Sequence, residues 1–375
     1  MDTIILIVVL IAVLAVLILV HEFGHFWIAK RNGIRVDEFG FGFPPRAKKL
    51  FNWKGTEFTL NWLPFGGFVK IFGENPDDPE LLGGKPKDSF IAKSRWVQAK
   101  VLFAGVVFNM ILAWLLFSVA YFAGTAAVLN SDSSLYKHMG PNQELMVTEV
   151  LPGSPAGKAD LAPGDIIKNV SELGNDRPYP NLDDQSFSSF IKDHQNEKLV
   201  ISYERDGREN SILVTPMVGV VSQDYASIGV GVGLSGEVKL PVHKAVWRGV
   251  TSSVKIFADI ISGLGAIIKD IFVKSDTSVL SQVSGPVGIA GIVKDAMSQG
   301  FTAVLMLVGI ISINLAVLNL LPFPALDGGR LMVLLIEKIR NKKLNSKVIM
   351  WINAVGFIVL IGLMIIVTIS DIIKI

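Results

Sequence analysis

The stretch TIILIVVLIAVLAVLILVHEFGH, residues 3–25, joins an uncharged apolar run to a His-Glu-x-x-His motif. A run of this length is close to what a helix needs to cross a membrane. His21 and His25 are four residues apart, so they share one helical face and can bind the same zinc ion. Glu22 follows the first histidine and can accept a proton from water at the metal. The stretch predicts a metal site at membrane depth.

Clustered ionisable groups are unusual in this position. Each costs about 2.5–3.5 kcal/mol at membrane depth on insertion scales, so three within five residues need a compensating partner, which a metal supplies. The alternative is that the helix has reached the aqueous face, where Lys30 and Arg31 follow, and that the histidines bind nothing.

Composition indicates a membrane protein. Half of the residues are hydrophobic and the mean hydropathy is +0.49. The first apolar run is expected to persist as a span rather than a signal peptide, because Asp2 precedes it and no small-residue cleavage site comes before His21. The pattern predicts a multi-pass α-helical protein with about four transmembrane helices. The four long uncharged stretches are 3–20, 101–128, 301–326 and 348–370.

The basic residues predict the orientation. Residues 28–96 contain twelve Lys and Arg, and residues 330–347 contain six against the single acid Glu337. Both segments are expected in the cytoplasm, with the N-terminus, the middle region and the C-terminus on the other side. The net charge of +2 gives no indication of nucleic-acid binding, and the absence of cysteine excludes disulfides and thiolate ligands.

Alternating apolar and polar residues in 39–43 and 57–72 predict a β-hairpin or small sheet, with a break at Pro64–Gly67. Its many aromatic residues suit either a sheet lying against the membrane interface or a soluble loop domain with its own core. Residues 74–87, rich in Pro, Gly and acids, are expected to form a connector.

The middle of the chain is polar and strand-rich. Residues 147–167 resemble the signature of a PDZ domain, a module that accepts an extended peptide as an added strand. Asp160 stands where that signature usually has glycine. Residues 244–274 carry apolar side chains at spacings of three and four, which predicts an amphipathic helix along the membrane surface or under the soluble domain.

A second motif, NLLPFPALDGG at 319–329, closes the third apolar stretch. Its prolines interrupt the helix, and unwound backbone at membrane depth is tolerated where it lines a cavity or is buried in protein. Asp327 is therefore the candidate third ligand, leaving a fourth tetrahedral position for water. Its alternative role is to cap a following helix from Gly329 to Ile339.

Together, the two motifs resemble those of the site-2 protease family of intramembrane zinc metalloproteases, in the RseP-type branch with one PDZ domain. Further segments that resemble the family are FGFG at 39–42, PFGGFVK at 64–70, the Gly105 and Asn109 pair, and SGPVGI at 284–289. Val106 stands where the family commonly has proline.

The resemblance implies one Zn²⁺ per chain, held by His21, His25 and Asp327, with Glu22 as general base and proton donor. Asn319 would bind the substrate backbone or, alternatively, the carbonyls that the prolines free. The hairpin around the break would capture an unwound substrate as an added strand. Its predicted substrate-binding residues are Pro64, Phe65, Gly66, Gly67 and Phe68.

The expected substrates are single-span membrane proteins already trimmed by another protease, such as anti-sigma factors or signal-peptide remnants, with peptide contact through the PDZ domain. The expected location is the bacterial inner membrane, with the active site near the cytoplasmic face and the PDZ domain outside. The predicted order is a first transmembrane helix (1–30), a cytoplasmic β region and connector (31–96), a second helix (97–128), a PDZ domain (129–240), an amphipathic surface helix and linker (241–300), a third helix (301–328), a cytoplasmic connection (329–347) and a fourth helix (348–375).

Two other functions remain open. A membrane metal transporter would bind metal through the same His and Asp side chains but would have no use for Glu22. An inactive scaffold that presents its PDZ domain would be favoured by a missing ligand or base, and none is missing from the motifs.

Overall fold

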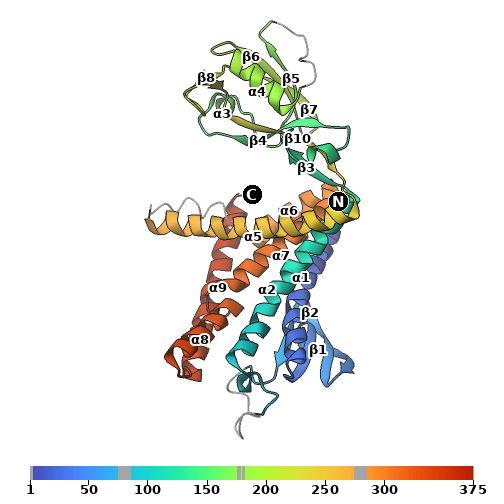
Figure 1. Cartoon of the computed structure of the whole chain (residues 1–375), viewed down its shortest axis with the longest axis vertical. Coiled ribbons are helices and arrows are strands. Elements are labelled where there is room, and N and C mark those ends of the chain that lie inside the picture. Colours follow the sequence, from blue (N-terminus) through green and yellow to red (C-terminus); the bar gives the residue numbers. More distant parts are fainter. Residues whose placement is uncertain (1–2, 75–85, 175–178, 180–181, 274–284, 375) are drawn as a thin grey trace. The chain divides into compact units, whose positions relative to one another are not determined.

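The structure is a computed structural model of the 375-residue chain and describes residues 3–74, 86–174, 179, 182–273 and 285–374. Most of the expected connector at 74–87 lies outside the described residues. The chain forms two compact units (Figure 1). Unit 1 comprises Met1–Ala120 and His243–Ile375, and unit 2, Tyr121–Val242, is inserted between them.

Unit 1 is built mainly from helices: α1 (Thr3–Arg31), α2 (Arg95–Ala123), α5 (Val242–Val273), α6 (Pro286–Gln299), α7 (Phe301–Leu320), α8 (Asp327–Arg340) and α9 (Ser346–Lys374). Among the described residues, five helices are long and apolar enough to cross a membrane: α1, α2, α5, α7 and α9. The multi-pass helical fold is confirmed. The number exceeds the expected four, because α5 is also long and apolar enough to cross a membrane.

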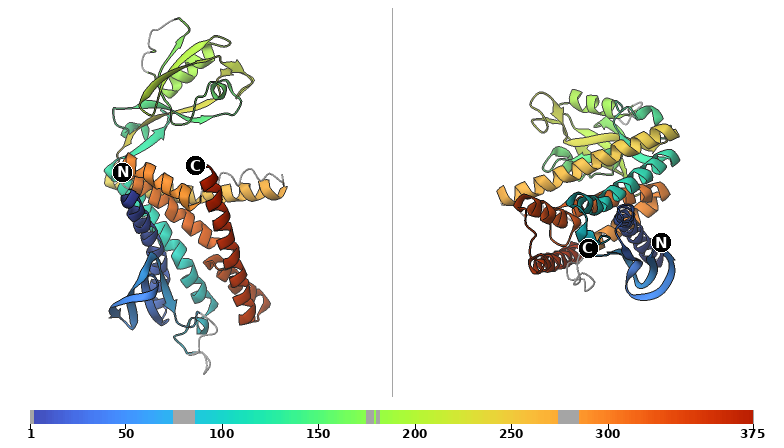
Figure 2. Two further views of the ribbon diagram at one scale, coloured as in Figure 1. Left: turned by 180° about the vertical axis from the view of Figure 1, so that it is seen from behind. Right: turned by 60° about the horizontal axis from the view of Figure 1, so that its bottom comes forward.

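Helix α5 runs crosswise to α1, α2, α7 and α9 within unit 1, near one end of those helices (Figures 1 and 2). Its first turns pack tightly on α2, where Trp114 Nε1–H donates to the carbonyl of Val246 at 3.1 Å. A Cβ on Gly249 would lie 2.3 Å from Ser118 Oγ, so glycine permits this close approach.

Strands β1 (Val36–Trp53) and β2 (Thr56–Ile71) form the predicted sheet after the first helix. They are joined by Lys54 and Gly55, which both have positive φ, as a tight two-residue hairpin turn requires. Phe39 pairs with Phe58 on one side and with Val69 on the other. The first half of β1 therefore lies between the two halves of β2, which the expected break at Pro64–Gly67 separates.

The sheet packs against α1 through aromatic rings. The ring of Phe26 lies 5.6 Å from that of Phe39 and 5.7 Å from that of Phe58, centroid to centroid. At the far part of the sheet, by contrast, Trp62 is 71% exposed and Leu63 48%. The sheet thus has a core of its own and also an exposed apolar part.

Unit 2 contains a six-stranded antiparallel sheet in the order β3-β10-β4-β5-β6-β7. Its strands are β3 (Thr125–Leu129), β4 (Glu144–Val150), β5 (Ile166–Glu172), β6 (Leu199–Arg205), β7 (Arg208–Val214) and β10 (Val230–Val238). The short strands β8 (Met217–Val218) and β9 (Ala226–Ser227) pair separately, and the helices are α3 (Pro155–Lys158) and α4 (Asp184–Asp193).

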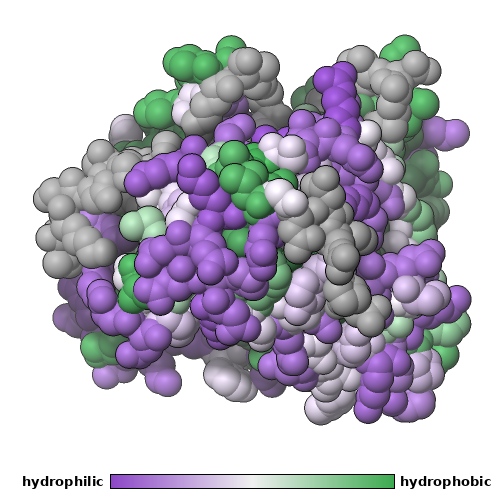
Figure 3. Space-filling view, turned by 90° about the horizontal axis from the view of Figure 1, so that it is seen from above, coloured by the Kyte–Doolittle hydropathy of each residue, from purple (hydrophilic) through white to green (hydrophobic). Residues whose placement is uncertain are grey.

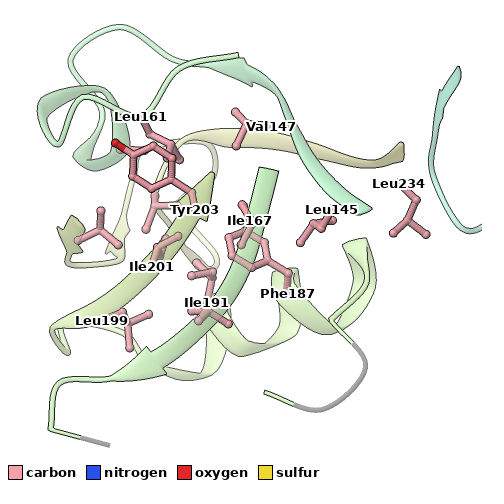
Figure 4. Packing of buried hydrophobic residues seen from close by; sticks show 14 residues of the cluster. Leu145, Val147, Leu161, Ile167, Phe187, Ile191, Leu199, Ile201, Tyr203 and Leu234 are labelled. Carbon is pink, nitrogen blue, oxygen red and sulfur yellow. The ribbon is translucent and has the colours of Figure 1, made fainter. Parts of the chain in front are cut away.

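One apolar core holds unit 2 together. Alternate residues of β6 are buried, as expected for a strand with one covered face, and they meet Phe187 and Ile191 from α4 (Figure 4). The surface seen from above is, by contrast, largely hydrophilic, with small separate apolar patches (Figure 3).

An ion pair to a buried carboxylate fixes the turn that carries the PDZ-like signature. Asp165, whose side chain is 1% exposed, accepts from Arg205 Nε at 2.6 Å and Nη2 at 2.7 Å. These bonds raise the pKa of the guanidinium above its usual value. Arg205 also donates to the backbone carbonyl of Asp160, whose φ of +64° is the conformation that glycine adopts readily.

We expect Asp165→Asn to weaken unit 2, because it replaces one carboxylate oxygen by an amide nitrogen that cannot accept from Arg205. A loss of about 1–3 kcal/mol in opening free energy is expected, measured by amide hydrogen exchange of β5 and β6 in the detergent-solubilised full chain. Asp193→Asn at the end of α4 is the matched control, since Asp193 is exposed and lies outside this turn. Equal exchange in the two variants would contradict the role of this ion pair.

Candidate metal centre

The two histidines of the first motif face the same point. His21 and His25 lie in α1, each 7% exposed, and their Nε2 atoms are 3.1 Å apart. Oδ2 of Asp327 lies 3.0 Å from Nε2 of His21 and 3.1 Å from Nε2 of His25. The structure therefore brings the three predicted ligands together, although Asp327 is 306 residues from His21.

Asp327 reaches this point because the chain between α7 and α8 is not helical. Helix α7 ends at Leu320, and α8 begins at Asp327 itself, two residues earlier than expected. The cap position of α8 belongs to Leu326, which makes no side-chain cap. The carboxylate of Asp327 thus faces the histidines and does not cap the helix.

The unwound segment is held closely by its surroundings. A Cβ on Gly328 would lie 2.1 Å from the carbonyl oxygen of Leu321, and one on Gly329 would lie 2.2 Å from that of Phe323. The two glycines therefore let the start of α8 pack directly on the backbone carbonyls of the turn.

Helix α9 supports the same segment from outside. Ala325 has a φ of +72°, rare for a residue with a side chain, and its N–H donates to Asn353 Oδ1 at 3.3 Å. A Cβ on Gly356 would lie 2.5 Å from Pro324, so α9 approaches the turn as closely as glycine allows. These contacts position Pro324 and Ala325, shortly before Asp327.

Helix α2 lies behind the imidazoles. The ring nitrogen Nδ1 of His25 lies 2.8 Å from the carbonyl oxygen of Val101, which only an N–H can approach as a hydrogen-bond partner. The proton of neutral His25 is therefore on Nδ1, and its Nε2 carries the lone pair that faces Asp327. One turn further along α2, Gly105 leaves room for both rings.

The donor set fits a zinc ion. Two imidazole nitrogens and a carboxylate oxygen are common zinc ligands, and tetrahedral coordination at about 2.0–2.1 Å places ligand atoms about 3.3–3.4 Å apart. The separations of 3.0 and 3.1 Å between these three atoms are slightly shorter. Small outward movements of the side chains would thus accommodate the ion and leave its fourth position open.

A cavity of about 330 Å³ adjoins the three ligands. Of the other predicted site residues, Glu22, Asn319 and Phe68 line it. Pro64, Gly66 and Gly67 lie in β2 outside the lining, and the side chain of Phe65 lies outside the described part of the structure. The glycines instead pack on α1, where a Cβ on either would lie within 2.8 Å of Ile18 or Leu19.

Two charged lining residues, Glu74 and Arg330, were not predicted. Arg330 forms an ion pair with Glu74 at the cavity, joining the start of α8 to the end of the β region. Arg330 follows Asp327 by three residues, so helical spacing could have placed it on the same side. Nothing in the sequence indicates its pairing with Glu74, 256 residues away.

A second group of possible ligands lies in unit 2. It comprises Glu172, His194 and Glu197, and both carboxylates are exposed. Nε2 of His194 is already 3.1 Å from Glu172, an ordinary surface ion pair. Among the described residues, the buried group at Asp327 is therefore the stronger candidate for a metal centre.

Known proteins resemble this chain along most of its length. A model of peptidase family M50 matches residues 9–363. The chain belongs to this family. A protein of Clostridium perfringens (strain 13 / Type A) named as a zinc metalloprotease is 33% identical over 360 residues, which cover 95% of each chain. The site-2 protease family and the zinc metalloprotease class predicted from the two motifs are confirmed.

Other M50 relatives match over similar lengths. Zinc metalloprotease RasP of Shouchella clausii (strain KSM-K16) is 29% identical, covering 97% of this chain and 98% of its own. Protease RseP of Yersinia pestis is 27% identical, covering 94% and 95%. Among solved structures, the PDZ domain of an SdrC-like protein from Listeria monocytogenes is 19% identical, covering 24% of this chain and 86% of that chain, with a TM-score of 0.20.

Gly105→Ala should impair metal binding, because the new Cβ would lie 2.4 Å from Cε1 of His21 and 2.6 Å from Nε2 of His25. We expect the displaced rings to lower zinc affinity by about 10–100-fold, as loss of supporting contacts typically does. Competition with a chromophoric chelator measures this. Gly291→Ala in α6 is the matched control, since nothing lies within 4 Å of its Cβ position. Equal affinity in both variants would show that Gly105 is not needed.

Proposed function

We propose that this M50 protein hydrolyses peptide bonds in the transmembrane segments of single-span membrane proteins, with one zinc ion held by His21, His25 and Asp327. The observation that carries the proposal is the meeting of three metal-binding atoms beside Glu22, in a cavity between helices long enough to cross a membrane. The names of the C. perfringens and S. clausii relatives support the choice of zinc.

The protein's own residues then have distinct tasks. A zinc ion bound here supplies a Lewis acid that acidifies water and polarises the scissile carbonyl. Glu22, next to His21 on α1 and lining the same cavity, accepts the proton of the attacking water and passes it to the leaving amine. Asn319 lies in the cavity wall, where it can hydrogen-bond the substrate backbone. The histidines must be neutral to bind metal, so activity is lost on the acid side.

Four helices are proposed to cross the inner membrane of a bacterium: α1, α2, α7 and α9. Helix α5 is proposed to lie along the outer surface, which its crosswise course and one-sided apolar pattern support (Figure 1). The basic segments 28–96 and 330–347 include the β1–β2 sheet and α8, which lie at the same end of unit 1, opposite the N and C labels (Figures 1 and 2). That end is therefore assigned to the cytoplasm, with unit 2 outside.

The two rival functions explain less of the site. A metal transporter has no need of a carboxylate beside the ligands, yet Glu22 lies in the cavity wall. A scaffold has no need of a complete ligand set, and all three ligands converge. Proteolysis uses both features.

Glu22→Gln tests the function, because glutamine keeps the size of the side chain but cannot accept the proton. In membranes that contain a tagged single-span protein, we expect cleavage to fall at least about 100-fold, the usual lower bound for general-base catalysis, while zinc content is unchanged. Cleavage at the wild-type rate would exclude Glu22 as the base. Zinc flux that persists in the variant would favour the transporter.

The substrate is proposed to bind along the edge of β2. Residues 67–71 pair with β1 on one side only, and Phe68, Val69 and Ile71 line the cavity. Val69 and Glu22 line the same cavity, so this edge lies beside the base. An unwound transmembrane segment could recover hydrogen bonds there as an added strand. The exposed Trp62 and Leu63 suit a sheet that dips into the membrane interface.

The lack of cysteine in the chain permits a direct test by disulfide cross-linking. Single substitutions Phe68→Cys, Val69→Cys and Lys70→Cys in the Glu22→Gln background are paired with single cysteines along a substrate. We expect the cross-linked substrate position to move by one residue for each step along β2, as in paired strands. Lys48→Cys in β1 is the control and should not cross-link. Partners that repeat every three or four substrate residues would mean that the substrate stays helical.

Unit 2 is proposed to restrict access, so that only substrates already trimmed by another protease reach the cavity. Its position in the chain supports this, because it is inserted between α2 and the amphipathic helix α5. Contact with substrate peptides through added-strand pairing would follow from the PDZ-like signature at 147–167.

A further inference from the structure

Asn109 is a fully buried polar residue on α2, 0% exposed and one helical turn beyond Gly105. Its carboxamide nitrogen lies 3.3 Å from Nδ1 of His21. Its carboxamide oxygen has no hydrogen-bond partner among the described residues. Burying an amide with so few partners costs about 1–3 kcal/mol, so its retention here calls for a task beyond packing.

The tautomer of His21 decides how this contact works. If the amide nitrogen donated to Nδ1, the imidazole proton of neutral His21 would be on Nε2, which points at Asp327 and His25 and could not then bind a metal. If the amide is turned by 180°, its oxygen accepts from Nδ1–H and the lone pair is on Nε2. The two orientations have nearly the same shape, so chemistry has to choose between them.

We infer that Asn109 is a positioning residue that accepts the Nδ1 proton of His21 and so directs the Nε2 lone pair at the metal position. This inference rests on the proposed metal site. Metal-binding histidines regularly donate their other ring N–H to an oxygen, which fixes the tautomer and the ring orientation. Asn109 supplies that oxygen for His21, as the carbonyl of Val101 does for His25.

The spacing along α2 supports the same task. Val101, Gly105 and Asn109 follow one another at intervals of four, so they occupy one face of the helix. The carbonyl of Val101 fixes one ring, Gly105 makes room for both, and the amide of Asn109 fixes the other. The backbone carbonyl of Asn109 accepts from Ser312 Oγ at 2.8 Å, which holds this part of α2 against α7.

The test compares zinc affinity in the purified full chain by competition with a chromophoric chelator. Asn109→Leu removes the acceptor at similar size and should weaken zinc binding about 10–100-fold. Asn109→Asp can accept but cannot donate, and should bind zinc within about threefold of wild type. Ser118→Ala is the matched control, because it removes a buried hydroxyl further along α2 that bonds the carbonyl of Trp114 and not Asn109, and it should leave affinity unchanged.

Each outcome decides the inference. Wild-type affinity in Asn109→Leu would overturn it, and so would an Asn109→Asp variant as weak as Asn109→Leu, since the contact would then need a donor. If Asn109→Leu does not fold, Asn109→Ala takes its place. The spectrum of bound Co²⁺ gives a second readout, which should change in the acceptor-free variants and be restored in Asn109→Asp. Failure of the wild-type chain to bind zinc would contradict the proposed function itself.

Discussion

The convergence of two imidazoles and one carboxylate inside a bundle of apolar helices is the constraint on which the rest of unit 1 depends. Each of these groups is costly to place away from water unless its polar atoms have partners. His21 and His25 come from one helix, and Asp327 has to be delivered by a segment far away in the sequence. The positions of α2, α7, α8 and α9 can all be understood as ways to hold these three side chains at one point.

Asp327 reaches the two histidines because a helix, α7, ends within the bundle. The prolines end α7, and the glycines in the first turn of α8 let that helix pack directly on the backbone carbonyls of Leu321 and Phe323. Ala325 adopts its rare backbone conformation because α9 holds it through Asn353. The strain near the third ligand is thus tolerated because neighbouring elements fix both of its sides.

Much of the site could be predicted because its signals are local. The four-residue spacing places His21 and His25 on one helical face whatever the rest of the fold, and a carboxylate after two prolines stands out in an apolar stretch. The carbonyl of Val101 could not be predicted, because every residue has one and only the packing of α2 selects it. The backbone conformation of Asp160 was predictable in part. Asp160 stands where the PDZ signature usually has glycine, and in the structure it has the positive φ that glycine adopts readily.

The fold was less predictable where elements of similar composition are arranged differently in space. An apolar stripe and an apolar cylinder can have similar average hydropathy, so α5 is long and apolar enough to cross a membrane although it runs crosswise to the helices beside it. The break at Pro64–Gly67 was visible from its residues. That the two halves of β2 flank β1 depends on pairing between segments and has no local signature.

Every contact that defines the metal centre lies within unit 1. The ligands, the supporting face of α2, the turn held by α9 and the strand edge beside Glu22 come from Met1–Ala120 or His243–Ile375. Among the described residues, unit 2 therefore interrupts the sequence of the site and supplies none of the residues that line it. Because unit 2 has its own core and its own ion pair, its stability and that of the metal centre rest on different interactions. If unit 2 restricts access as proposed, a change in it would alter which substrates arrive while leaving the proposed chemistry at Glu22 intact.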